Sequence, residues 1–104
     1  MTTPTRITVT ANDLAAGKAA DCYRCPAARA INRRLDRKLF RAHVSGDMVR
    51  IKDRYGCVVF RTLTPKVLSD LIENYDFAQW DFVNPPIRFS LDLPAHVLRR
   101  GKAI

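Results

Sequence analysis

Residues 39–63 read LFRAHVSGDMVRIKDRYGCVVFRTL, and this stretch decides the fold. It contains three runs rich in β-branched and other apolar residues, 39–44, 48–53 and 57–63, in which polar side chains alternate with apolar ones. Ser-Gly-Asp separates the first two runs and Arg-Tyr-Gly the last two, which is the composition of tight turns. The stretch therefore predicts a three-stranded antiparallel meander.

One strand and two helices are predicted before the meander. Residues 6–10 alternate between polar and β-branched side chains, as a short strand does. Asn12 or Asp13 can cap a brief helix that ends at Gly17. Residues 25–35 predict a second helix, because a proline occupies its first turn and its apolar residues fall on one stripe.

One helix and one strand are predicted after the meander. Thr64 and Pro65 begin a helix that runs to about residue 75, and residues 87–93 alternate into a last strand. The order is strand, helix, helix, three strands, helix, strand. It predicts an α+β fold, mainly an antiparallel sheet of about four to five strands with two or three helices packed on one face.

Length and composition describe an ordinary globular chain. Its 104 residues predict a single domain over residues 1–104, with flexible ends at 1–5 and 99–104. The hydrophobic fraction of 47% argues against a disordered protein. Because no apolar run approaches the length of a membrane span and no signal-peptide core is present, we expect a soluble cytoplasmic protein without membrane contact.

The unusual quantity is the net charge of +8, from 18 Lys and Arg against 10 Asp and Glu. Strand alternation places one group of basic residues on the sheet face away from the helices. Its members are Arg41, His43, Arg50, Lys52, Arg61 and Arg88. A second group follows the predicted helix at 25–35. Acidic residues collect instead at 70–81, so the molecule is polarised. The residues predicted to contact a partner are Arg29, Arg33, Arg34, Arg37, Lys38, Arg41, Arg50 and Lys52.

This charge favours an acidic partner, nucleic acid or acidic protein, over the simpler interpretation of a solvated surface. It argues against mimicry of nucleic acid. The helices do not form a helix-turn-helix, and aromatic residues do not alternate with the basic ones on the exposed sheet face. The pattern therefore indicates phosphate contact or protein docking more than base recognition.

Three cysteines suit a reduced intracellular protein better than a disulfide framework. Cys22 and Cys25 form a C-x-x-C pair, for which His43 and Cys57 are the weak candidates to complete a zinc site. A redox dithiol and plain packing are the other interpretations of the pair. No nucleophile elbow, paired carboxylates or glycine-rich phosphate loop appears, so we expect no enzymatic activity and no cofactor.

The chain resembles a known group of proteins in the pattern of its first third. Ile7-Thr8-Val9, Asp13-Leu14, Gly17, Cys22, Cys25-Pro26, Ala28 and Ala30-Ile31 follow in that order. They resemble a family of small proteins encoded by bacteriophages and prophages, in which an I-T-V strand leads to a D-[LI]-x-x-G turn and a C-P-x-A-x-A-[IL] helix. Gly46, Thr64-Pro65 and Phe89-x-Leu91 extend the similarity over most of the chain.

The resemblance implies a non-enzymatic phage product that acts in the cytoplasm of a bacterial host. Its implied function is to inhibit a host defence nucleoprotein machine, as anti-CRISPR proteins do. The partner is then a host protein or ribonucleoprotein complex, with or without direct nucleic-acid contact. The alternatives are a nucleic-acid-binding accessory or regulatory protein of the phage, and a small zinc or redox protein built on Cys22 and Cys25. Monomer and homodimer both remain open.

Overall fold

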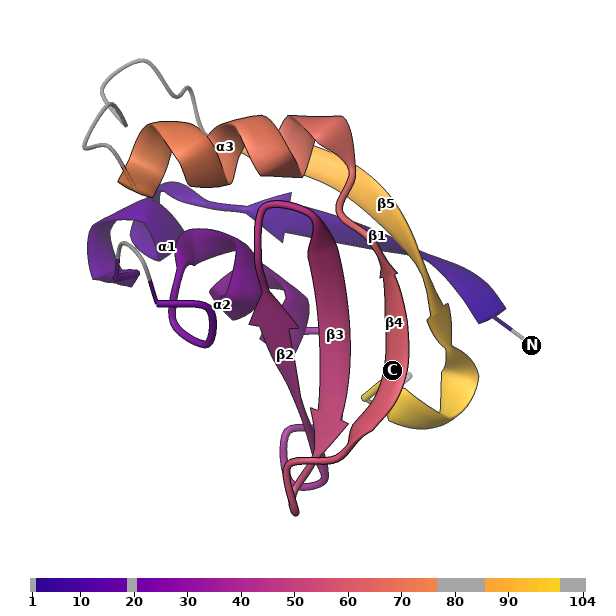
Figure 1. The fold of residues 1–104 in the computed structure, drawn as a ribbon. Helices are drawn as coiled ribbons and strands as arrows, with labels where there is room; N and C mark the ends of the chain where they lie inside the picture. The colour runs from indigo at the N-terminus through magenta and orange to yellow at the C-terminus, as the bar shows by residue number, and fades with distance from the viewer. Residues whose placement is uncertain (1, 19–20, 77–85, 100–104) are drawn as a thin grey trace.

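The computed structural model describes residues 2–18, 21–76 and 86–99, and its elements follow the predicted order (Figure 1). A short 3-10 helix, η2 (Ala95–Val97), is an addition to that order. The strands and helices are β1 (Thr2–Val9), α1 (Ala11–Ala16), α2 (Pro26–Asn32), β2 (Phe40–Val44), β3 (Met48–Asp53), β4 (Val58–Leu63), α3 (Lys66–Asp76) and β5 (Ile87–Pro94).

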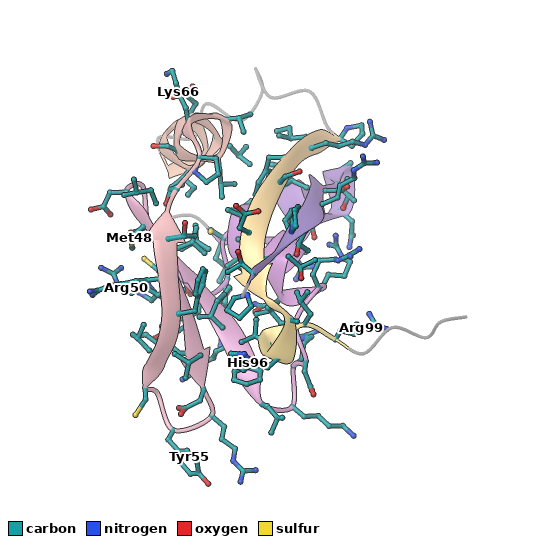
Figure 2. All side chains as sticks on the ribbon, turned by 90° about the vertical axis from the view of Figure 1, so that its right-hand side faces the viewer. Met48, Arg50, Tyr55, Lys66, His96 and Arg99 are labelled. Carbon is teal, nitrogen blue, oxygen red and sulfur yellow. The ribbon has the colours of Figure 1, made fainter. Side chains whose placement is uncertain are left out.

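The α+β class is confirmed, but the five strands form two antiparallel sheets where a single sheet was expected. β1 pairs with β5 along its whole length, from Thr2 opposite Pro94 to Val9 opposite Ile87. The meander forms the second sheet, in the order β2-β3-β4. The two sheets face each other across the core, with α1 and α2 to one side and α3 across one end (Figures 1 and 2).

The core collects apolar side chains from both sheets and from the helices. The inward-facing positions of β1, β2, β3 and β5 agree with the strand alternation in the sequence. These buried residues are Ile7, Val9, Ala42, Val44, Val49, Ile51, Phe89, Leu91 and Leu93. Strict alternation with Phe60 would also point Val58 inward, but Val58 is exposed because the pairing of β3 with β4 shifts register after Ile51.

Helix α2 lies at the centre of this arrangement and contacts both β1 and β2. Its Ala27, Ala28 and Ala30 are buried together with Ile31, and their small side chains let it approach two sheets at once. The helix ends at Asn32, earlier than predicted. The Asn32 side-chain oxygen then accepts the backbone N–H of Ala42 at 2.8 Å, which ties the helix to β2.

The N-terminal segment is more ordered than the sequence suggested. β1 begins at Thr2, so Thr2–Thr5 pair with β5, although a flexible end was expected there. Thr10, rather than Asn12 or Asp13, caps α1, and Asp13 completes a capping box by accepting the Thr10 N–H at 2.9 Å.

The C-terminal segment is tied to the loop after α2. The backbone N–H of Arg99 donates to the carbonyl of Arg34 at 2.9 Å, and Leu35 forms an isolated bridge with Leu98. The rest of the expected flexible end, 100–104, lies outside the described residues. Among the described helices, none has the length and apolar character needed to cross a membrane.

Candidate anion-binding surface

The short segment between α1 and α2 presents the ring of Tyr23 beside the outer face of β2. One carboxylate oxygen of Asp21 accepts the backbone N–H groups of Tyr23, at 2.9 Å, and Arg24, at 3.1 Å. The carbonyl of Cys22 accepts the N–H of Val44 at 2.9 Å. These bonds hold the segment against the end of β2 and fix where the tyrosine lies.

Tyr23 is surrounded by side chains of the outer sheet face. Its hydroxyl accepts a hydrogen bond from Lys52 Nζ at 2.7 Å. The Arg41 guanidinium lies 4.9 Å from the ring centroid, within cation–π range. The His43 ring meets Tyr23 edge to face, with centroids 4.8 Å apart. Lys52 Nζ lies 5.2 Å from the ring centroid, and its main contact with Tyr23 is the hydrogen bond to the hydroxyl.

His43 is an uncharged member of this group. Burial lowers the pKa of His43, and the positive charges of Lys52 and Arg50 lower the pKa further. Its Nδ1 atom is buried and has no hydrogen-bond partner among the described residues. The histidine is therefore neutral at pH 7, and the charge of the sheet face comes from arginine and lysine.

Tyr23 also lines a basic hollow of about 320 Å³. Five of the side chains that line it are cationic, and Tyr23 forms part of its wall. The lining residues are Ala16, Lys18, Tyr23, Arg24, Arg29, Asn32, Arg33 and Arg37. Tyr23 thus joins the hollow to the outer face of β2, β3 and β4, which carries Arg41, Arg50, Lys52 and Arg61. We call the hollow and this sheet face together the Tyr23 surface.

The buried carboxylate of Asp13 lies behind this hollow. It accepts a hydrogen bond from Arg33 Nη2, while Arg33 Nη1 donates to the carbonyl of Thr8 at 3.1 Å. Arg29 Nε lies 3.5 Å from the same carboxylate, an ion pair without hydrogen-bond geometry. Asp13 therefore fixes two of the basic side chains and neutralises part of their charge.

The pKa of Asp13 reflects two opposing effects. Burial raises the pKa, but the hydrogen bond from Arg33 and the backbone N–H of Thr10 outweigh it, so the net pKa is lowered. The carboxylate is therefore ionised at neutral pH even though its side chain is inaccessible to solvent.

The sheet face of the Tyr23 surface places like charges directly opposite one another. Arg41 faces Lys52 across β2 and β3, and Arg50 faces Arg61 across β3 and β4. Like charges at directly opposed positions destabilise a sheet. Among the described residues none of these four forms an ion pair, and Arg50 points outward, away from the β5 side of the molecule (Figure 2).

The structure brings together most of the residues predicted to contact a partner. Arg29, Arg33 and Arg37 line the hollow, and Arg41, Arg50 and Lys52 lie on the sheet face. Arg34 and Lys38 are exposed but belong to neither part; Lys38 lines other depressions, beside Asp36 and Phe40.

One predicted member lies elsewhere, and three members were not among the predicted contacts. Arg88 is on β5, which pairs only with β1, so it belongs to the other sheet. Lys18 and Tyr23 were missed, and Arg24, although it begins the basic group along the second helix, was not chosen as a contact, because the bond between Cys22 and Val44 that positions their segment joins residues far apart in the chain. The C-x-x-C spacing of Cys22 and Cys25 indicated a zinc or redox site in this segment and gave no sign of a basic surface.

The zinc candidates are not brought together. Cys25 is buried at the N-terminus of α2, where its Sγ accepts the N–H of Ala28 at 3.4 Å. Cys22 lies beside the end of β2, whereas the exposed Cys57 follows the β3–β4 turn, next to Asp53 and the start of β2. Within the described part of the chain, no three His, Cys, Asp or Glu side chains gather as metal ligands.

What the Tyr23 surface offers chemically is a dense set of guanidinium and ammonium donors. Such groups bind phosphate and carboxylate oxygens by charge-assisted hydrogen bonds, and arginine does so with two parallel bonds. Comparison of the chain with protein-family models, with curated proteins and with solved structures gives no match in any of the three.

Removing the charge of Asp13 tests its part in the fold. We expect Asp13→Asn to lower the free energy of unfolding at pH 7 by about 2 kcal/mol, less than for a fully buried pair because both arginines reach solvent. The folded pKa lies below the unfolded one, so the stabilisation is present above the unfolded pKa and is lost as the pH falls through the folded pKa.

Urea denaturation between pH 2 and pH 7 measures both effects. The wild-type chain should lose stability in this acid range more steeply than Asp13→Asn does. Asp70→Asn is the control, because Asp70 pairs with Lys66 only on the exposed surface of α3 and should cost about 0.5 kcal/mol or less. Equal losses at pH 7 in the two variants would contradict the role given to Asp13.

Reversing one charge of the opposed pairs tests whether they strain the sheet. We expect Arg61→Glu to raise the free energy of unfolding by about 0.5 kcal/mol at low salt, because it converts a repulsive pair with Arg50 into an attractive one. Arg88→Glu changes the net charge equally but faces Thr8, so it should have a smaller effect. Urea denaturation of both variants at low and high salt gives the comparison, and an equal gain in both would refute the idea.

Proposed function

We propose that this protein is a non-enzymatic binding protein that contacts the phosphate backbone of nucleic acid through the Tyr23 surface. The observation that carries the proposal is the continuity of cationic side chains from the hollow, past Tyr23, to the outer face of β2, β3 and β4. Phosphate contacts of this kind give affinity without base recognition and depend strongly on salt.

The opposed like charges support the same function. A sheet that keeps Arg41 opposite Lys52 and Arg50 opposite Arg61 gives up stability in the free protein. A polyanion bound over these pairs neutralises the repulsion, so binding removes the destabilisation that the like charges cause in the free protein. Binding sites commonly keep arrangements that reduce stability in this way.

The bacteriophage resemblance adds a biological setting to this proposal. In that setting the nucleic acid belongs to a host defence nucleoprotein machine, such as a CRISPR effector, and the protein inhibits the machine by occupying its guide or target strand. The protein then acts in the cytoplasm of the bacterial host and needs no cofactor.

A second candidate function is docking on an acidic protein surface. It is favoured by the apolar side chains beside the cations: Leu63 on β4 is 74% exposed and Val59 is 40% exposed, and β4 is an edge of its sheet. Nucleic-acid backbone would leave these side chains unburied, whereas a protein partner would cover them.

Neutralising the sheet face tests nucleic-acid binding. We expect the wild-type chain to bind random DNA and RNA with a micromolar dissociation constant at physiological salt. The double variant Arg50→Gln, Arg61→Gln should bind about tenfold more weakly, with a salt slope reduced by about 2. Fluorescence anisotropy over a range of salt concentrations measures both quantities.

The matched control is Arg6→Gln, Arg88→Gln. It removes the same charge from the outer face of the other sheet, and both side chains are exposed. Its affinity should change by less than about twofold. Absence of binding by the wild-type chain at physiological salt, or equal weakening in the two double variants, would rule the proposal out.

Truncating an apolar side chain separates the two candidates. Leu63→Ser leaves every cation in place, so it should not alter the affinity for nucleic acid. Retention of a host protein from a nuclease-treated bacterial lysate by the wild-type chain, with release by Leu63→Ser, would favour docking on protein. Retention that disappears with nuclease would favour nucleic acid.

A further inference from the structure

The basic hollow differs in shape and in support from the sheet face of the Tyr23 surface. The sheet face is formed by neighbouring strands, whereas the hollow is a half-open concavity of about 320 Å³, the lower end of the size range of small-molecule sites. A concave set of cations suits a compact anion, because donors from several directions converge on it.

Two of the five cations in the hollow are held in place from behind. Arg33 is fixed by hydrogen bonds to Asp13 and to the Thr8 carbonyl, and Arg29 lies beside the same carboxylate in an ion pair, with its Nε 3.5 Å away. Both side chains remain partly exposed, at 43% and 36%. Their remaining guanidinium N–H groups form no bonds among the described residues, so they are oriented in advance and free to bind a ligand.

The charge balance of the hollow indicates how many negative charges a ligand needs. Five cationic side chains line it and one carboxylate, Asp13, lies behind it. A single carboxylate ligand would leave most of that positive charge uncompensated. A polyphosphate group carries several negative charges in a volume of this size and offers oxygens to each arginine.

The side chain of Tyr23 is largely engaged by its neighbours on the sheet face. Arg41 lies over its ring, the His43 ring meets it edge to face, and Lys52 occupies its hydroxyl end. Among the described residues, Tyr23 is the one aromatic residue in the lining of the hollow, and its ring already contacts these three side chains, so the hollow lacks the aromatic platform on which a nucleobase stacks. Recognition in the hollow therefore depends on phosphate and not on the identity of the base.

We propose that the hollow binds the polyphosphate group of a nucleoside triphosphate or of a 5′-triphosphorylated strand, without preference among bases. This inference rests on the proposed function. The sheet face contacts the phosphate backbone of the nucleic acid, and the hollow binds a terminal polyphosphate group. Lys18 and Arg37 supply exposed charge to the lining, and Arg29 and Arg33 supply donors that pair with Asp13.

Inorganic tripolyphosphate is the probe for this site. Isothermal titration calorimetry should show one bound tripolyphosphate per chain with a dissociation constant below about 1 mM, and ATP and GTP should bind within about threefold of one another. The variant Lys18→Gln, Arg37→Gln should weaken tripolyphosphate about tenfold or more. Both side chains are exposed, and neither forms a side-chain hydrogen bond among the described residues, so the fold should be retained.

The sheet-face variant Arg50→Gln, Arg61→Gln is the matched control and should keep tripolyphosphate affinity within about twofold. Comparison of 5′-triphosphorylated with 5′-hydroxyl RNA of the same sequence tells a strand end from a free nucleotide as the source of the phosphates. Tighter binding of the triphosphorylated RNA favours the strand end, and equal binding of the two RNAs with retained ATP binding favours the nucleotide.

Absence of tripolyphosphate binding at about 1 mM, or equal loss in the two double variants, overturns the inference. If random nucleic acid still binds with a salt slope in that case, only the hollow assignment fails. If neither tripolyphosphate nor nucleic acid binds, the proposed function fails with it.

Discussion

One buried carboxylate, Asp13, connects the fold to the candidate site. It closes the capping box of α1 through the Thr10 N–H, and it accepts a hydrogen bond from Arg33, which follows α2 directly. An ionised group without solvent contact is costly unless it is paired and hydrogen-bonded, and here both conditions are met. The same bonds that seat α1 against α2 also set the direction of two arginines at the edge of the molecule.

Helix α2 links the Asp13 carboxylate to both sheets. Because Ala27, Ala28 and Ala30 are small, the helix lies against β1 and β2 together, and Asn32 at its end holds the backbone of Ala42. A helix with large side chains would force the sheets apart. The small alanines therefore let α2 carry Arg29 close to both sheets, and the loops before and after the helix supply Tyr23 and Arg37.

The sequence predicted the order of elements, the α+β class and most inward-facing positions, because these depend on local turn chemistry and strand alternation. It did not predict the division into two sheets, since the pairing of β1 with β5 joins opposite ends of the chain and excludes the meander. That division moved Arg88 off the basic face. The predicted arginines were chosen by charge density, which cannot show that Asp13 partly neutralises Arg29 and Arg33.

The place of Tyr23 in the site could not be predicted from the sequence, because the bond between Cys22 and Val44 that positions its segment joins residues far apart in the chain. The ring packs beside three basic positions, and that packing is favourable only while His43 is uncharged, because a third cation beside Lys52 and Arg50 would add repulsion. Burial and those same neighbours lower the pKa of His43, so the surface itself keeps the histidine neutral. The positive field then comes wholly from arginine and lysine, whose charge does not change across physiological pH. A polyanion therefore meets a surface of constant charge, with a neutral tyrosine and histidine holding its two parts together.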